Sequence, residues 1–460
     1  MRVSRHVAPR EWVALATLAA LMLVALFTGG SARDDVPGLI VLRPFAALCL
    51  TVAVLTMTRD VLREHRAALI LAGAWIALIA LHLVPLPPAV WMSLPGRELA
   101  VEAGVAAGIG QPWRPIALVP WRAWNAFFAA LVPLAALLLA VQLTPRQRQW
   151  LGIAALAIGM ASAAIAFLQL LAPGRGLFYL YRFTSSNLPV GLMANRNHQA
   201  ALLASMLPIL AAVASDPETF RPRGRRIAAL ALGVFFAFMA VMTGSRGGLA
   251  AVVVGLIAAA LIYRTPPSRR SPQIAVEGRT RWLVWAGGGM LVAALVGFAL
   301  WRSTVLARVA TTPGSGETRF EIWGPIAEMV RTYLPFGSGF GSFVEVYAIG
   351  EPLALLDTSY TNHAHNDLLE LALEGGLPAL ALLLVAILAW GRRAIGLFAG
   401  GVRDSQEART AAAGAAIVLV LGLASVVDYP VRTPLVAIIL AIGAAWLGKP
   451  DGQGVGSPKR

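Results

Sequence analysis

Apolar runs of 15 to 23 residues recur along this chain of 460 residues. A helix needs about 20 apolar residues to cross the roughly 30 Å of hydrocarbon in a bilayer. Only 13% of the residues are charged, against roughly 25% in a soluble domain, and the mean hydropathy is +0.71. The sequence therefore predicts an all-α polytopic membrane protein with about twelve transmembrane helices. The predicted spans are 12–28, 36–57, 67–84, 124–143, 150–172, 197–214, 227–243, 247–263, 282–301, 377–391, 410–427 and 434–448.

The basic residues indicate the orientation of these spans. The net charge is +15, and 24 of the 38 Lys and Arg residues fall in short segments on one side of the membrane. Because cytoplasmic loops are enriched in Lys and Arg, this side is predicted to be the cytoplasm, with both termini inside. The basic residues are distributed over the short cytoplasmic segments and form no continuous basic stripe, so no nucleic acid partner is expected. We predict a single membrane domain over 1–460 that ends in a cytoplasmic tail at 449–460.

Two outer loops stand out by length and composition. The loop at 85–123 is rich in Pro and Trp. Amphipathic aromatic rings favour the headgroup layer, so we expect this loop to contact membrane lipids at the surface. The loop at about 302–376 is the only long polar stretch of the chain. It is the predicted position of a catalytic loop.

The polar loop is expected to contain short helices. Its segment Glu317–Tyr333 has the pattern of an amphipathic helix. A second short helix is expected over 361–374, capped by Thr361 or Asn362 at its start. The pair Gly375–Gly376 should end it, because glycine readily leaves the helical conformation.

Two of the six histidines lie at the start of this second helix, at positions 363 and 365. Ionisable residues are costly beside a bilayer, so His363 and His365 together form a functional-site hypothesis. A neutral imidazole can take a proton from an attacking hydroxyl, which favours general-base catalysis, with Asp367 or Glu370 orienting the ring. The spacing His-x-His-x-Asp also occurs in metallohydrolases, but Leu368 stands where another histidine would follow. We therefore predict no metal site.

The two histidines are expected to differ in role. On a continuous helix, His363 would share one face with Asp367, Glu370 and Glu374, whereas His365 would point elsewhere. The alternative is a purely structural patch, in which these polar side chains satisfy the backbone groups of the loop.

Arginines accompany the histidines on the predicted outer side. Arg246 lies between glycines, which lets a ligand approach its guanidinium closely, and arginine matches phosphate oxygens with two parallel hydrogen bonds. Several arginines facing one another would need an anion between them, and a diphosphate is the obvious candidate. Structural alternatives stay open, namely an interfacial anchor for Arg246 and a surface pair of Arg319 with Glu317 or Glu321. The remaining outer polar residues of interest are Arg196, Asn197, His198, Asp428 and Arg432.

These motifs, taken in order, resemble the O-antigen ligase/polymerase superfamily, which consists of bacterial inner-membrane glycosyltransferases. The resemblance is strongest over about 190–435. The motifs that carry it are Asn195-Arg-Asn-His, Gly244-Ser-Arg-Gly-Gly, Arg319-x₃-Trp323, Pro335-x-Gly-x-Gly-x-Gly and Asn362-His-Ala-His-Asn-x₃-Glu370-x₃-Glu374-x-Gly376.

The resemblance implies inverting transfer of a glycan from undecaprenyl pyrophosphate to a sugar hydroxyl, at the periplasmic face of the inner membrane. His365 matches the family's loop histidine, which would activate the acceptor. Arg246 and Arg319 match its pyrophosphate-binding arginines. No cofactor is implied, because the donor's diphosphate is its own leaving group. Supporting roles are expected for His363, Arg196, Asn197, Asp367, Glu370 and Arg432.

Three functions remain in competition. A ligase would move the glycan onto lipid A–core, and a polymerase would join lipid-linked repeat units of an O-antigen or exopolysaccharide. We favour the ligase. A secondary transporter is the alternative from another class, but it would be expected to place its charges at mid-membrane, whereas only Arg43 lies clearly within a predicted span.

Overall fold

The computed structural model describes residues 8–172, 176–185, 187–216, 222–264, 317–356, 360–399 and 405–448. Within these ranges the secondary structure is helical, apart from an isolated bridge between Leu86 and Arg114. Eight of the described helices are long and apolar enough to cross a membrane. They are α1 (Pro9–Thr28), α2 (Leu39–Thr56), α7 (Pro120–Ala140), α8 (Pro145–Leu171), α9 (Arg196–Ala214), α10 (Pro222–Met242), α17 (Asp367–Ala399) and α18 (Gln406–Val427).

The other described helices are shorter. Three of them are apolar, namely α4 (Arg66–Leu81), α11 (Arg246–Ile262) and α19 (Pro434–Trp446). The rest connect or cover the bundle. They are α3 (Arg59–Glu64), α5 (Pro88–Trp91), α6 (Glu98–Ala106), α14 (Glu317–Glu321), α15 (Trp323–Tyr333), α16 (Phe343–Gly350) and the 3₁₀ turns η1 (Leu353–Leu355) and η2 (Pro430–Arg432).

The prediction of about twelve transmembrane helices is therefore supported only in part. Eleven of the predicted spans coincide with a helix, but α4, α11 and α19 are shorter than a typical span. Helix α19 starts only at Pro434, because η2 occupies the residues before it, and its 13 residues span about 20 Å. The predicted span 282–301, the start of the polar loop at 302–316 and the tail at 449–460 lie outside the described residues.

Helix α9 is the centre of the bundle. It packs against α8, α10, α11 and α18, and nearly all of its residues are buried. The contact with α11 is close because small residues meet there. A Cβ atom added to Gly248 would lie 2.3 Å from the Cβ of Ala200, and one added to Gly255 would lie 2.7 Å from the carbonyl oxygen of Ala204. Small residues of this kind allow the backbones of membrane helices to approach each other.

The two ends of α9 meet opposite ends of α18, so these helices are antiparallel. At one end, the Asn197 side chain donates a hydrogen bond to Asp428, which follows α18. At the other end, the Gln406 side chain, at the start of α18, donates to the carbonyl oxygen of Ala212. This arrangement places Asn197 and Asp428, which are far apart in the sequence, at the same end of the bundle.

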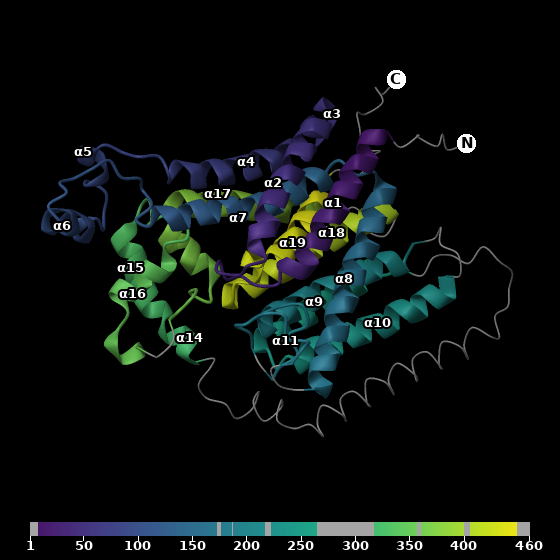
Figure 1. The fold of residues 1–460 in the computed structure, drawn as a ribbon. Helices are drawn as coiled ribbons and strands as arrows, with labels where there is room; N and C mark the ends of the chain where they lie inside the picture. The colour runs from purple at the N-terminus through teal and green to yellow at the C-terminus, as the bar shows by residue number, and fades with distance from the viewer. Residues whose placement is uncertain are drawn as a thin grey trace, which may run out of the picture.

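The loop at 85–123 packs against the polar loop, which the prediction of a membrane-surface role did not include. In Figure 1, α5 and α6 lie at the same end of the molecule as α15 and α16. The buried Arg97 donates hydrogen bonds to the carbonyl oxygens of Ile116 (2.7 Å) and Gly337 (3.3 Å). The backbone N–H of Leu118 donates to the carbonyl oxygen of Ser338 at 2.9 Å. The first loop therefore supports the glycine-rich turn of the second.

Helix α17 begins at Asp367 rather than at 361 or 362, so the predicted start was wrong. The Asn366 side chain accepts hydrogen bonds from the N–H groups of Leu368 and Leu369, which fixes the first turn at this later position. The predicted break at the glycine pair is present, because Gly376 has non-helical angles (φ 61°, ψ −155°) within α17. The residues of α17 before Gly376 thus form a separate short helix in front of the longer apolar one.

We expect Gly376→Ala to lower the free energy of unfolding by roughly 2–4 kcal/mol. The positive φ disfavours a side chain, and a Cβ atom would lie 2.2 Å from the carbonyl oxygen of Pro335. Gly391→Ala in the same helix is the matched control, because no atom lies within 4 Å of its added Cβ. Thermal unfolding in detergent should show a lower midpoint for the first variant alone. Equal midpoints would show that the kink does not require glycine.

Candidate active site

The loop in front of α17 is held by hydrogen bonds to Ala364, the residue between the two histidines. Its N–H donates to the Glu370 carboxylate at 2.8 Å, and its carbonyl oxygen accepts from the Trp323 indole at 3.0 Å. His365 has a positive φ of 51°, a backbone conformation that few residues other than glycine adopt. Such a conformation persists only where the surroundings enforce it. The turn directs the two histidines to different partners.

His365 is paired with Asp428. Its Nδ1 lies 3.2 Å from Oδ1 of Asp428. A carboxylate only accepts hydrogen bonds, so the hydrogen of the neutral ring must be on Nδ1, which leaves Nε2 as the basic nitrogen. This pairing corrects the expectation that Asp367 or Glu370 orients the ring of the candidate base. Asp428 follows α18 and is 63 residues from His365 along the chain, so local spacing gave no signal for the pair.

Several polar side chains of the site contact the Asp428 carboxylate. Arg319 Nη1 lies 3.7 Å from its Oδ2, and the Asn197 side chain donates a hydrogen bond to the same oxygen. His198 Nε2 lies 3.9 Å from Oδ1. Burial alone would raise the pKa of Asp428, but its hydrogen bond with His365 and the charge of Arg319 hold the pKa below its usual range. The carboxylate is therefore charged at neutral pH and can orient His365.

His363 belongs to a second group of charges. Its Nδ1 lies 2.8 Å from Oε1 of Glu370, and the same oxygen lies 3.1 Å from Nη1 of Arg432. Arg432 also donates to Asp367 at 2.8 Å and lies 3.7 Å from Glu374. His363 reaches Glu370 from the loop, so the prediction that it shares a helix face with the carboxylates was wrong. The two histidines thus have separate charged partners, and a difference in their roles stays a prediction.

The Tyr429 ring lies between the histidines. Its centroid is 4.2 Å from that of His363, 5.0 Å from that of His365 and 4.9 Å from that of His198. Burial raises the pKa of its phenol, so Tyr429 packs against the histidines as a neutral ring. No sequence pattern indicated this contact, because it depends on how the 428–432 turn packs onto the loop.

The arginines do not form one facing group. Arg432 contacts carboxylates, and Arg319 pairs with Asp428. The side chain of Glu317, one of the two suggested surface partners of Arg319, lies outside the described part of the chain. Arg246 and Arg196 are the first residues of α11 and α9, and both are at least partly exposed. A Cβ atom on Gly247 would lie 3.0 Å from Val427, so Arg246 stands beside the Asp428 turn. Arg246 and Arg319 remain the candidates for binding an anion.

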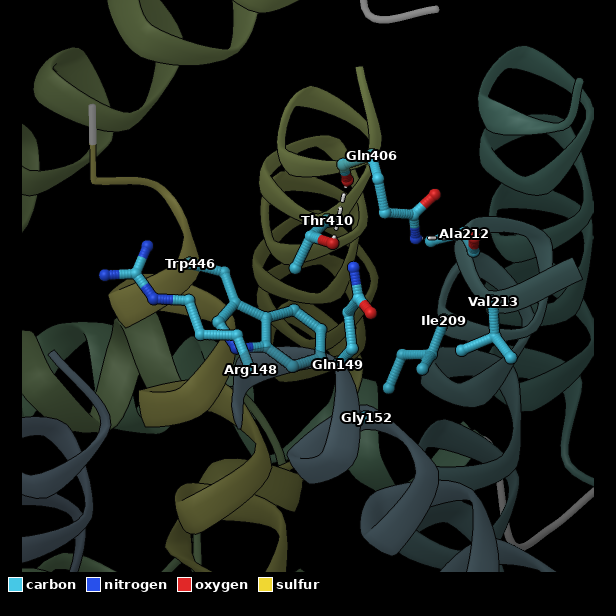
Figure 2. A pocket seen from close by; sticks show the side chains of 9 residues that line it. All are labelled: Arg148, Gln149, Gly152, Ile209, Ala212, Val213, Gln406, Thr410 and Trp446. Atoms are coloured by element: carbon cyan, nitrogen blue, oxygen red, sulfur yellow. Dashed lines mark hydrogen bonds between the residues drawn. The ribbon is translucent and has the colours of Figure 1, made fainter. Parts of the chain in front are cut away.

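No metal cluster accompanies these residues in the part of the chain that the structure describes. No group of three or more His, Cys, Asp or Glu side chains there is arranged to hold a metal ion. Figure 2 shows a small pocket at the far end of α9, which lies about 20 Å along the helix from His198. It is lined by Arg148, Gln149, Gly152, Ile209, Ala212, Val213, Gln406, Thr410 and Trp446.

Residues 231–384 match the protein family described as O-antigen ligase. The chain carries an O-antigen ligase family domain. No curated protein matches the chain. The family is one of membrane glycosyltransferases that act on lipid-linked glycans, and the multi-pass helical architecture described above agrees with it.

The O-antigen ligase domain contains only part of the candidate site. Arg246, Arg319, His363 and His365 lie within the matched residues, whereas Asp428 lies outside them. The fold brings the start of α9 and the 428–432 turn to the domain's histidine loop. The site is therefore built by the whole bundle rather than by the matched segment alone.

Proposed function

We propose that this protein is an inverting, O antigen ligase-like glycosyltransferase. It moves a glycan from undecaprenyl pyrophosphate to a sugar hydroxyl of an acceptor such as lipid A–core, in lipopolysaccharide or surface polysaccharide biosynthesis. The observation that supports this most is the His365–Asp428 pair. Arg319 shares the Asp428 carboxylate, and both His365 and Arg319 lie within the matched family domain.

The proposed reaction is a single displacement. With hydrogen on Nδ1 held by Asp428, Nε2 of His365 takes the proton of the acceptor hydroxyl. The hydroxyl oxygen bonds to the anomeric carbon of the donor sugar while the bond from that carbon to the pyrophosphate oxygen breaks. The attack comes from the side opposite the leaving group, so the anomeric configuration inverts. The products are the extended glycan and undecaprenyl pyrophosphate.

Arg319 and Arg246 would bind the pyrophosphate, where negative charge develops as the bond breaks. Arg319 is only partly buried and 3.7 Å from Asp428, so its other N–H groups can reach a phosphate. Stabilising this charge is expected to be the main catalytic contribution. The donor brings its own leaving group, so we propose that neither a nucleotide nor a metal ion takes part. Added EDTA should leave the transfer rate unchanged.

Replacing Arg319 by alanine should lower kcat/KM for transfer by about 10²-fold, because one group that stabilises the leaving pyrophosphate is lost. Arg319→Lys should recover only part of this, since lysine keeps the charge but not the planar fork. Arg331→Ala is the matched control, because Arg331 lies in the same loop and pairs with the exposed Glu328. Similar kcat/KM values for Arg319→Ala and Arg331→Ala would show that Arg319 does not stabilise the leaving pyrophosphate.

The glycan profile of a strain lacking this gene tests the function, read by gel electrophoresis and mass spectrometry. We expect long glycans retained on undecaprenyl pyrophosphate, with bare lipid A–core at the surface. Lipid A–core carrying a single repeat unit would indicate a polymerase instead. An unchanged profile of every glycan would contradict the glycosyltransferase proposal. The proposed location is the bacterial inner membrane, with the site facing the periplasm. Labelling of the histidine loop by a reagent added from the periplasmic side would support it.

A further inference from the structure

Three distant segments meet around Arg33, beside the candidate active site. Its guanidinium carbon lies 4.3 Å from the centroid of the Phe183 ring and 5.4 Å from that of Tyr360. Arg33 lies between α1 and α2, Phe183 between α8 and α9, and Tyr360 shortly before the histidine loop. We call Arg33, Phe183 and Tyr360 the aromatic rim. The mechanism proposed above uses none of the three.

The segment that carries Arg33 is tied to the elements of the site. The N–H of Gly30 donates to the Tyr181 hydroxyl at 2.7 Å, and the carbonyl oxygen of Gly30 accepts from the N–H of Ala194 at 2.8 Å. The carbonyl oxygen of Gly29 accepts from the N–H of Leu435 at 2.9 Å. A Cβ atom on Gly30 would lie 1.9 Å from the carbonyl oxygen of Leu192, so only glycine fits there. The rim is thus fixed against the starts of α9 and α19.

The aromatic rim is close to the candidate base. Tyr360 and His365 are five residues apart, so their Cα atoms are at most about 18 Å from each other. This distance corresponds to a few sugar rings. A glycan that reacts near His365 can therefore reach the rim with its next units.

The chemistry of the rim suits a polyhydroxylated ligand, and Arg182, 5.3 Å from the Phe183 centroid, adds a positive charge beside it. Phe183 and Tyr360 are 52% and 55% exposed, so parts of their faces are available for the C–H faces of sugar rings. Arg33 donates to both oxygens of Asp35, at 2.9 and 2.8 Å, and this pair carries no net charge. A phosphate would favour an arginine whose fork is not already matched by a carboxylate. The Arg33–Asp35 pair instead offers hydrogen-bond donors and acceptors to hydroxyl groups.

We propose that the aromatic rim is a sugar-binding subsite that holds the glycan beyond the ring that reacts. The inference rests on the proposed function, since it assumes that a glycan occupies the site. The bound sugars belong either to the donor's chain or to the core oligosaccharide of the acceptor. Both have the same chemistry, so experiment must separate them.

Binding can be measured without transfer, on the full-length protein in lipid nanodiscs. The two probes are glycan released by mild acid from the source strain's surface polysaccharide and core oligosaccharide freed of lipid A, each followed by saturation-transfer difference NMR. Phe183→Ala and Tyr360→Ala should each weaken binding of one probe about 3- to 10-fold. Phe183→Tyr and Tyr360→Phe keep the rings and should bind as the unchanged protein does. Trp113→Ala is the control, because this tryptophan is 65% exposed and lies in the 85–123 loop.

The probe that loses affinity assigns the subsite to the donor or to the acceptor, and either result supports the proposal. Unchanged affinity of both probes in both alanine variants would overturn it, as would failure of the unchanged protein to bind either probe. A loss of thermal stability without a loss of affinity would also overturn it, because the rim would then only anchor the protein at the lipid headgroups. Failure of the proposed function would instead appear as an unaltered glycan profile in the deletion strain.

Discussion

Replacing His365 by alanine is expected to slow glycan transfer by a factor on the order of 10²–10⁴, the usual contribution of a positioned general base. Nδ1 of each histidine faces a buried carboxylate, but Nε2 of His363 is itself buried, whereas the His365 side chain is 21% exposed, so His365 is the one that an acceptor hydroxyl can reach. The rate constant kcat should fall while KM for the donor stays nearly constant, because His365 is not proposed to bind the pyrophosphate. The assay is transfer by the purified protein with lipid-linked donor extracted from the source strain.

His363→Gln separates the roles of the two histidines. His363 is bonded to Glu370 and packs on Tyr429, so its replacement should lower thermal stability more than kcat. His365→Gln should be as inactive as His365→Ala, because an amide forms hydrogen bonds but cannot take the proton. If His363→Gln lost activity while His365→Ala kept it, the assignment of the base would have to be reversed.

The two histidines of the loop have different carboxylate partners. His365 is paired with Asp428, whereas His363 is paired with Glu370, which Arg432 also contacts. The neutral ring of Tyr429 lies between the two histidines. Each histidine has its own carboxylate partner. We therefore expect that His365 can change protonation during the reaction without rearranging the contacts of His363.

The helices and the common location of the polar motifs followed from sequence. Hydrophobic run length predicted where helices form, since burial of apolar residues decides this for a membrane chain. The glycine pair predicted the break in α17, because Gly376 requires a positive φ. These features depend on local chemistry, which a single sequence displays directly.

The side-chain partners did not follow from sequence, because they depend on packing between distant helices. Asp428 reaches His365 only when α18 lies against α9 and α17, as it does in the bundle. The predicted helix face containing His363 was wrong for a local reason, since Asn366 caps α17 four or five residues later than expected. For Arg319 the sequence left open a surface pair with a neighbouring glutamate, and it did not indicate the buried Asp428, which lies 3.7 Å away in the fold.

Replacing Asp428 by asparagine should lower kcat by a factor on the order of 10²–10⁴, with little change in protein fold. Asparagine has nearly the same shape, but its amide can donate to Nδ1 of His365 and so favour the tautomer whose Nε2 carries the hydrogen. The corresponding exchange in a serine protease triad lowers kcat by about 10⁴ for this reason. Glu328→Gln, an exposed carboxylate in the polar loop, is the matched control and should keep full activity.

The pH dependence gives an independent check on Asp428. Its pKa is lowered in the folded protein, so its contribution to stability is present above the unfolded value of about 3.9 and is lost only as pH falls through the folded value. Loss of activity between pH 5 and 7 should therefore come from another group.

The double variant His365→Ala with Asp428→Asn decides whether the two residues act as a unit. If Asp428 works only by positioning His365, the double variant should be no slower than His365→Ala alone. Multiplied losses would mean that Asp428 has a separate role, for example in holding Arg319 for the pyrophosphate. In that case KM for the donor should rise in Asp428→Asn, whereas the positioning role predicts a fall in kcat at constant KM.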